Sequence, residues 1–161
     1  MLDLACGGGR HSRYLAALGF EVVAVDRDEQ ALWSLSGLRG VSTRHCDLEA
    51  DAWPFAAERF DAIVVTNYLH RPLLPLLGGA LALDGLLIYE TFAQGNQCYG
   101  KPSNPLFLLL PGELLAAAHG LRVLAYEDLF VDQPRPALVQ RLCARNGSEV
   151  PGQPPPGQRI G

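Results

Sequence analysis

The order of residue types in the first 26 residues constrains this chain more than any other feature. A short apolar strand at 1–5 is followed by glycines at 7–9, a helix-like stretch, and a second apolar strand at 21–25 that ends at Asp26. Glycine in such a turn lets the backbone approach a ligand closely, and a carboxylate at a strand end can accept hydrogen bonds from both hydroxyls of a ribose. The order therefore predicts a nucleotide-type pocket.

Two classes of cofactor use this arrangement, and the glycine spacing separates them. A dinucleotide site has the spacing Gly-x-Gly-x-x-Gly, whose third glycine packs the helix against the strand. Here residues 10–12, which follow Gly9, include no glycine. Asp3 in the first strand adds a negative charge, which disfavours a pyrophosphate and favours a ligand with an amino group. The nicotinamide-dependent oxidoreductase is therefore the alternative enzyme class.

The later part of the chain alternates strands with helices and ends in strands alone. This alternation predicts an α/β fold with a doubly wound, mostly parallel sheet and an antiparallel C-terminal strand pair. The expected strands are 1–5, 21–25, 41–45, 60–66, 86–92, 121–131 and 136–144. The expected helices are 10–18, 28–35, a weak one over 72–81, and 111–119, with a short helix or none over 47–59.

Composition places most of the chain in one domain, 1–145. Residues 93–105 are rich in Gly, Asn, Gln and Pro and predict a long loop, in which Tyr99 and Lys101 are candidates for a lid. Residues 146–161 are dominated by Gly and Pro and predict a disordered tail. The first helix is expected to bury an apolar face that includes His11, Tyr14, Leu15 and Leu18.

Five segments carry a family resemblance. Residues 2–9 (LDLACGGG), Asp26 and residues 45–48 resemble the glycine motif, the ribose-binding acid and the adenine-flanking segment of the class I S-adenosylmethionine-dependent methyltransferases. Residues 60–67 and 85–92 resemble the fourth and fifth strands of that family. The chain is similar in particular to small bacterial tellurite-resistance-type methyltransferases. The resemblance implies a Rossmann-like methyltransferase fold and S-adenosylmethionine as the cofactor.

The resemblance also implies which residues form the site. In this family the acid of the glycine motif attracts the methionine amino group, here Asp3, and the acid after the third strand accepts from the adenine amino group, here Asp47. Asn67 and Tyr68 correspond to residues that line the methyl-transfer path. The implied cofactor-binding residues are Asp3, Ala5, Cys6, Gly7, Gly9, Asp26, Arg27, Cys46, Asp47, Leu48 and Asn67.

His70 follows the fourth strand and is the candidate general base, because the ordinary pKa of histidine suits proton removal near neutrality. The catalytic candidates are thus Asn67, Tyr68 and His70. A base is needed only if the acceptor must lose a proton, and an acceptor that is already anionic needs none. Two interpretations of Arg10 stay open: its side chain lies in solvent at the start of the helix, or it pairs with a carboxylate of the cofactor or the substrate.

The remaining sequence features limit the partners, the metal content and the location that we expect for the protein. A net charge of −4 disfavours nucleic acid as a partner, and no apolar stretch is long enough to cross a membrane. The four cysteines lack metal-ligand spacing, so we expect reduced thiols, no metal and a cytoplasmic location. The expected partner is a small-molecule methyl acceptor, and the composition permits a homodimer. The family usually has a helix before the first strand, whereas the first residues here already belong to that strand. We therefore expect this helix to be missing. A non-catalytic cofactor-binding module is accordingly the alternative from another class.

Overall fold

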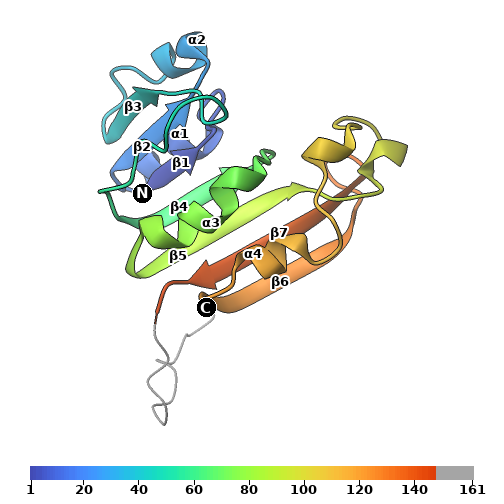
Figure 1. Ribbon diagram of the computed structural model, residues 1–161. Helices are drawn as coiled ribbons and strands as arrows, with labels where there is room; N and C mark the ends of the chain where they lie inside the picture. Colours follow the sequence, from blue (N-terminus) through green and yellow to red (C-terminus); the bar gives the residue numbers. More distant parts are fainter. Residues whose placement is uncertain (148–161) are drawn as a thin grey trace.

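The computed structural model describes residues 1–147 and consists of one seven-stranded sheet with short helices on its faces (Figure 1). The strand order is β3-β2-β1-β4-β5-β7-β6, and β7 is antiparallel to both of its neighbours while β1 to β5 are parallel. This confirms the predicted doubly wound sheet with an antiparallel C-terminal pair. The strands are β1 (Leu2–Leu4), β2 (Val22–Asp26), β3 (Val41–His45), β4 (Phe60–Thr66), β5 (Leu81–Phe92), β6 (Arg122–Val131) and β7 (Ala137–Arg145).

The helices are all short, and local chemistry explains where they begin and end. The Asp28 side chain caps one of them, as its Oδ1 accepts from the backbone N–H groups of Gln30 and Ala31. Pro75, which has no N–H, and the glycines at 78–79 keep the region after β4 to a few residues of helix between 3₁₀ turns. The helices are α1 (Arg10–Ala17), α2 (Glu29–Trp33), α3 (Leu74–Leu77) and α4 (Glu113–Ala117). The 3₁₀ turns are η1 (Arg71–Leu73), η2 (Gly78–Ala80), η3 (Asn96–Cys98) and η4 (Pro105–Phe107).

Alternating side chains of the strands divide the interior between the two faces of the sheet. Leu2 and Leu4 of β1 belong to the main hydrophobic core, together with Leu77 of α3 and Leu114 of α4. Asp3, between them in sequence, points to the other face and bonds with α1. The core therefore lies mainly under α3 and α4, and α1 and α2 contact the β2–β3 edge (Figure 1).

The predicted apolar face of α1 is wrong for Tyr14 and Leu18, while His11 and Leu15 are half-buried. Tyr14 and Leu18 are 64% and 57% exposed, and the buried residue of this helix is Ser12. Ser12 turns toward the sheet because its backbone N–H and its hydroxyl both donate to the buried Asp3 carboxylate. Two hydrogen bonds to a buried charge fix the rotation of the helix, and this outweighs the pattern of apolar side chains.

The bounds of β5 and α4 differ from the sequence prediction. β5 begins at Leu81, five residues earlier than expected, because Leu81 pairs with Phe60 before a bulge shifts the register. The predicted helix over 111–119 is limited to α4, and residues 47–59 form turns without a helix, as expected. The predicted tail lies outside the described residues from 148 onward; Asn146, its first residue, still bonds to the carbonyls of 81 and 82.

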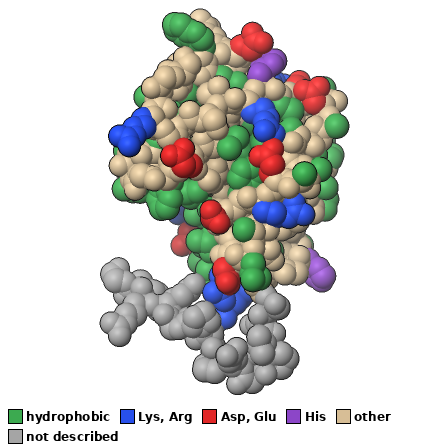
Figure 2. Space-filling model, turned by 90° about the vertical axis from the view of Figure 1, so that its left-hand side faces the viewer, with side chains coloured by type: hydrophobic (Ala, Val, Ile, Leu, Met, Phe, Trp, Pro, Cys, Tyr) green, Lys and Arg blue, Asp and Glu red, His purple; other side chains and the backbone are tan. Residues whose placement is uncertain are grey.

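The surface offers no large region of one charge in the view of Figure 2, where acidic and basic side chains are interspersed with apolar ones. Within residues 1–147, the longest helix has eight residues, so none of the helices is long and apolar enough to cross a membrane.

Candidate functional site

The turn between β1 and α1 has a backbone that glycine alone fits well. Gly7 has a φ of 51° and Gly9 a φ of 72°, both in the left-handed region. A Cβ on Gly9 would also lie 2.3 Å from Leu35 Cδ2. Ala5 adopts a φ of 53°, although it is not glycine. The turn thus packs against Leu35, which follows α2 in the chain.

Asp26 ties this turn to the end of β2. Its Oδ2 accepts from the Gly7 N–H at 2.8 Å, and its Oδ1 accepts from the Asp28 N–H at 3.0 Å. A carboxylate has about four lone-pair positions, so two are used by the backbone and two are left for a ligand. The carboxylate is therefore held in one orientation at the position that the resemblance assigns to the ribose.

Asp3 and Cys6 lie beside the turn, and neither lines the cavity at the carboxyl ends of the strands or the cavity that adjoins it. Burial raises the pKa of the Asp3 carboxyl, and the hydrogen bonds from Ser12 act in the opposite direction. Burial, with the charges of Asp3 and Asp26, raises the pKa of the Cys6 thiol to about 12. Cys6 is therefore a protonated packing residue, and the expected link from Asp3 to a methionine amino group stays a prediction.

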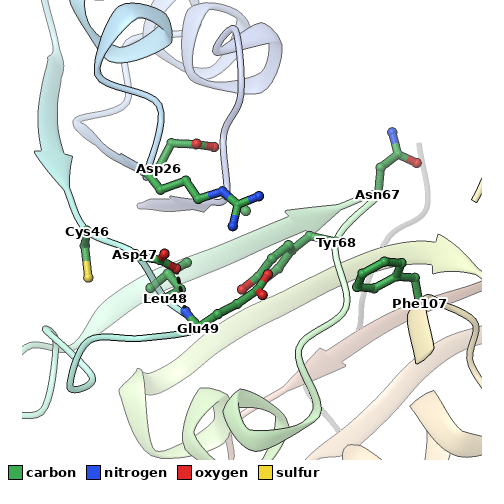
Figure 3. A pocket seen from close by; sticks show the side chains of 10 residues that line it. Asp26, Cys46, Asp47, Leu48, Glu49, Asn67, Tyr68 and Phe107 are labelled. Atoms are coloured by element: carbon green, nitrogen blue, oxygen red, sulfur yellow. Dashed lines mark hydrogen bonds between the residues drawn. The ribbon is translucent and has the colours of Figure 1, made fainter. Parts of the chain in front are cut away.

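A first cavity of about 300 Å³ lies at the carboxyl ends of the parallel strands (Figure 3). Most of the predicted cofactor residues line it, and they come from the ends of β1 to β4. Cys46 and Leu48 are buried and form its apolar side. The lining residues are Ala5, Asp26, Arg27, Cys46, Asp47, Leu48, Glu49, Asn67, Tyr68 and Phe107.

The segment after β3 is folded into a turn by its own carboxylates. Asp47 Oδ1 accepts from the Glu49 N–H at 3.0 Å, and the Asp47 N–H donates to Asp51 Oδ2 at 2.9 Å. Figure 3 shows the Glu49 side chain extending across the cavity toward Tyr68. Three carboxylates, of Asp26, Asp47 and Glu49, thus line the first cavity beside one guanidinium.

A second cavity of about 210 Å³ adjoins the first. Its walls come from the ends of β4 and β5 and from the two loops that follow β5. Four residues line both cavities and form the passage between them: Glu49, Asn67, Tyr68 and Phe107. The other residues around the second cavity are Leu69, Thr91, Phe92 and Pro102.

Phe107 reaches this junction because an arginine holds its loop. The Arg71 guanidinium forms a bidentate ion pair with Glu113, at 2.6 and 2.9 Å, and also donates to the carbonyls of Leu106 and Leu108. Bidentate pairing fixes the orientation of both side chains. The two carbonyls flank Phe107, so the Arg71 clasp (Arg71, Glu113 and the two carbonyls) places the Phe107 ring.

Some of the predicted residues are not brought to the cavities. His70 is half-buried and precedes η1, and it lines neither cavity. Tyr99 packs on Phe130, with ring centroids 5.1 Å apart, and Lys101 is exposed. Arg10 is exposed, and its guanidinium lies near the ring of His11, 3.3 Å away. The geometry therefore gives no support to His70 as the base or to a lid formed by Tyr99 and Lys101.

Several residues that line the two cavities were not predicted from the sequence. Glu49 stands two positions after the predicted Asp47, so the turn after β3 was a usable signal for it. Phe107 and Pro102 come from the long loop after β5, where neither periodicity nor a motif marks a ligand contact. Within residues 1–147, no three His, Cys, Asp or Glu side chains gather where a metal ion could be held.

Comparison with known proteins finds a family match for the part of the chain that carries most of the first cavity. Residues 1–77 match the model of a methyltransferase domain family, a segment that contains β1 to β4 and most of the first cavity. The search of curated proteins found no match.

Solved structures of low sequence identity share the fold. TehB from Haemophilus influenzae superposes with a TM-score of 0.73 at 21% identity, over 89% of this chain and 57% of that one. A TehB-like SAM-dependent methyltransferase from Corynebacterium glutamicum gives 0.64 at 22% identity, over 89% and 77%. The cyclase SpnF gives 0.69 at 16% identity, over 92% and 74%. The chain thus spans little more than half the length of the TehB structure.

These findings confirm the predicted Rossmann-like methyltransferase fold. The family match over residues 1–77 and the SAM-dependent enzyme from Corynebacterium glutamicum agree with the class and the cofactor that the sequence resemblance implies.

Proposed function

We propose that this protein transfers a methyl group from S-adenosylmethionine to a small-molecule acceptor. The observation that carries the proposal is the pair of adjoining cavities that share Glu49, Asn67, Tyr68 and Phe107. A transfer between two small molecules needs a site for each and a junction where the reacting atoms meet. The first cavity is assigned to the cofactor and the second to the acceptor.

The residues of the first cavity fit this cofactor. The fixed Asp26 carboxylate has lone pairs free for ribose hydroxyls, and Cys46 and Leu48 offer an apolar surface to an adenine ring, with Asp47 beside them. Three carboxylates against one guanidinium make the cavity negative on balance, which suits a sulfonium and disfavours a pyrophosphate. S-adenosylmethionine supplies, when bound, a methyl group that its sulfonium has already activated.

Asn67 and Tyr68 are the residues that we assign to the junction. Asn67 sits at a φ of 54°, and its N–H donates to the Glu90 carbonyl, so the backbone at the end of β4 is held in a rarely used conformation. Burial, then the nearby Glu49 charge, raises the pKa of the Tyr68 hydroxyl, which therefore keeps its proton. Both side chains can hydrogen-bond an acceptor and orient it.

The work of the protein in this proposal is positioning. Holding two reactants in line can supply about 7–11 kcal/mol of the barrier reduction without any acid or base. Phe107 and Tyr68 place two aromatic rings at the junction. His70 is not part of this proposal, because it lines neither cavity.

The proposal also covers the class of acceptor, the compartment and the oligomeric state. A net charge of −4 supports a small-molecule acceptor over a nucleic acid. The four free cysteines support a reducing compartment, here the cytoplasm of a bacterium. A homodimer is compatible with the composition and is tested by sedimentation of the purified protein.

Thermal unfolding with three ligands tests the cofactor assignment. A ligand at about 100 times its Kd adds about 2.7 kcal/mol to the unfolding free energy, which for a domain of this size raises Tm by roughly 5–10 °C. We expect this shift with S-adenosylmethionine and S-adenosylhomocysteine and none with NAD. A shift with NAD alone would overturn the assignment and favour the oxidoreductase.

A further inference from the structure

The second cavity differs in chemistry from the first. Leu69 and Phe92 are buried, and Pro102 and Phe107 add two more apolar surfaces. Its volume of about 210 Å³ is smaller than the roughly 300–1,000 Å³ of pockets for drug-sized ligands. The cavity is therefore suited to a small molecule whose body is hydrocarbon or aromatic.

Its charge is set by a single carboxylate. Glu49 is the only ionised side chain among the residues that line the second cavity, and no Lys, Arg or His of the described chain lines it. Arg27 lines the first cavity alone, and Arg71 is committed to Glu113 and two carbonyls. Lys101 is exposed and lines neither cavity. The charge of Arg27 reaches the Tyr68 hydroxyl from the first cavity, but Asp26 and Asp47 act there with the opposite sign. An anionic ligand would therefore meet negative charge on balance.

Three of the four polar residues that line the second cavity lie at its junction with the first, and the fourth, Thr91, belongs to β5. The Tyr68 hydroxyl is buried and has no hydrogen-bond partner within residues 1–147, and the Glu49 side chain extends toward Tyr68 (Figure 3). Asn67 completes this group. A buried hydroxyl without a partner costs free energy, which a ligand with a polar atom at that place recovers.

We propose that the second cavity binds a small apolar amine, with its nitrogen at Glu49 and Tyr68 and its hydrocarbon body against Leu69, Phe92 and Phe107. This rests on the proposed function, since it names the acceptor class of the same site. The amine binds as an ammonium whose N–H groups donate to the Glu49 carboxylate at the junction with the first cavity. One of these protons passes to the carboxylate, and the freed nitrogen lone pair then forms the N–C bond to the methyl group as the bond from that methyl group to the sulfonium sulfur breaks. Oxyanions are disfavoured as acceptors, because no cationic side chain of residues 1–147 lines this cavity.

Three probes of the same shape and different charge test this assignment. Benzylamine is positively charged at neutral pH, as a lysine amine is, benzyl alcohol is neutral and benzoate is negative. Their dissociation constants are measured by titration calorimetry on the full chain saturated with S-adenosylhomocysteine. We expect benzylamine to bind about three- to tenfold more tightly than benzyl alcohol, the range for a solvent-accessible ion pair, and benzoate to bind most weakly.

Two variants show whether Glu49 is responsible. Glu49→Gln keeps the size of the side chain and removes its charge, so it should abolish the preference for benzylamine and leave benzyl alcohol binding unchanged. Asp61→Asn is the matched control, because it removes one exposed charge at the start of β4, the end of the strand away from the junction. The control should keep the full preference.

The outcomes separate this inference from the proposed function. Saturable binding of S-adenosylhomocysteine in all three proteins, with benzoate bound as tightly as benzylamine, would overturn the amine assignment and leave the cofactor assignment in place. A preference for benzylamine that survives in Glu49→Gln would also overturn it. Failure of S-adenosylhomocysteine to bind the wild-type chain would instead contradict the proposed function itself.

Discussion

Replacing Asp26 is the sharpest test of the cofactor site, because one side chain serves both the turn and the ligand. In the free protein its two oxygens accept from the N–H groups of Gly7 and Asp28. Asp26→Asn keeps the shape, but it replaces one acceptor oxygen by an NH2 group that faces an N–H donor, and it removes the charge. A hydrogen bond to a charged group contributes about 1.5–3 kcal/mol, so we expect the Kd of S-adenosylhomocysteine to rise by roughly 10- to 150-fold.

Titration calorimetry gives this Kd directly, and two controls accompany it. Thermal unfolding without ligand reports how far the variant loosens the glycine turn, so that a loss of folding is not taken for a loss of contact. Asp61→Asn, which changes the same kind of residue far from the cavities, should bind with the wild-type Kd. A Kd of Asp26→Asn within about twofold of wild type, a difference below the roughly 0.5 kcal/mol scatter of surface substitutions, would refute the ribose assignment.

Three further predictions concern the scaffold of the site. Gly9→Ala should lower the unfolding free energy by about 1–3 kcal/mol, because the backbone is left-handed there and the new methyl group overlaps Leu35; chemical denaturation measures this, and an unchanged midpoint would contradict it. Arg71→Met should release the loop that carries Phe107 and lower the unfolding free energy by about 1–3 kcal/mol, less than for a fully buried ion pair because the side chain is partly exposed. Faster amide hydrogen exchange at residues 106–108 is the specific sign. Exchange at the wild-type rate would count against the clasp. Burial raises the pKa of Asp3 in the folded state, so its contribution to stability is fully present below the unfolded pKa, near 3.8, and is lost as the pH rises through the folded pKa. Asp3→Asn should flatten the pH dependence of Tm above pH 3.8, and an unchanged pH profile would show that Asp3 titrates normally.

Local and periodic features of this fold were predictable from the sequence. The cap at Asp28, the five parallel strands and the antiparallel pair follow from residue types within a few positions of each other. The first cavity followed as well, since the carboxyl ends of adjacent parallel strands meet at one edge of the sheet. Asp26 and Asp47 lie at such ends and line this cavity, and their contacts with the cofactor stay predictions.

Features that depend on distant contacts were not predictable. The rotation of α1 is set by Ser12 and Asp3, a buried polar pair that an apolar pattern does not reveal. The second cavity exists because Arg71 bonds to a loop 35 residues away and so brings Phe107 to the end of β4. Neither interaction has a local sequence signature, because each depends on where the sheet places the two segments.

The fold by itself does not fix the reaction. The cyclase SpnF shares it over 92% of this chain at a TM-score of 0.69, so the proposed methyl transfer rests on the two cavities as well as on the family match. In this account the residues around the junction, not the glycine turn, determine which acceptor is used. The distinguishing residues are therefore Glu49, Tyr68 and Phe107, two of which lie outside any motif.

The location of the cofactor methyl group tests the central claim most directly. S-adenosylmethionine labelled with ¹³C in its methyl group is bound to the full chain, and nuclear Overhauser contacts from that methyl group are measured by NMR. The account predicts contacts to the ring protons of Tyr68 and Phe107, which disappear one at a time in Tyr68→Leu and Phe107→Leu. Saturable binding with methyl contacts only to residues away from these two rings would contradict the claim that the cavities meet at the point of transfer.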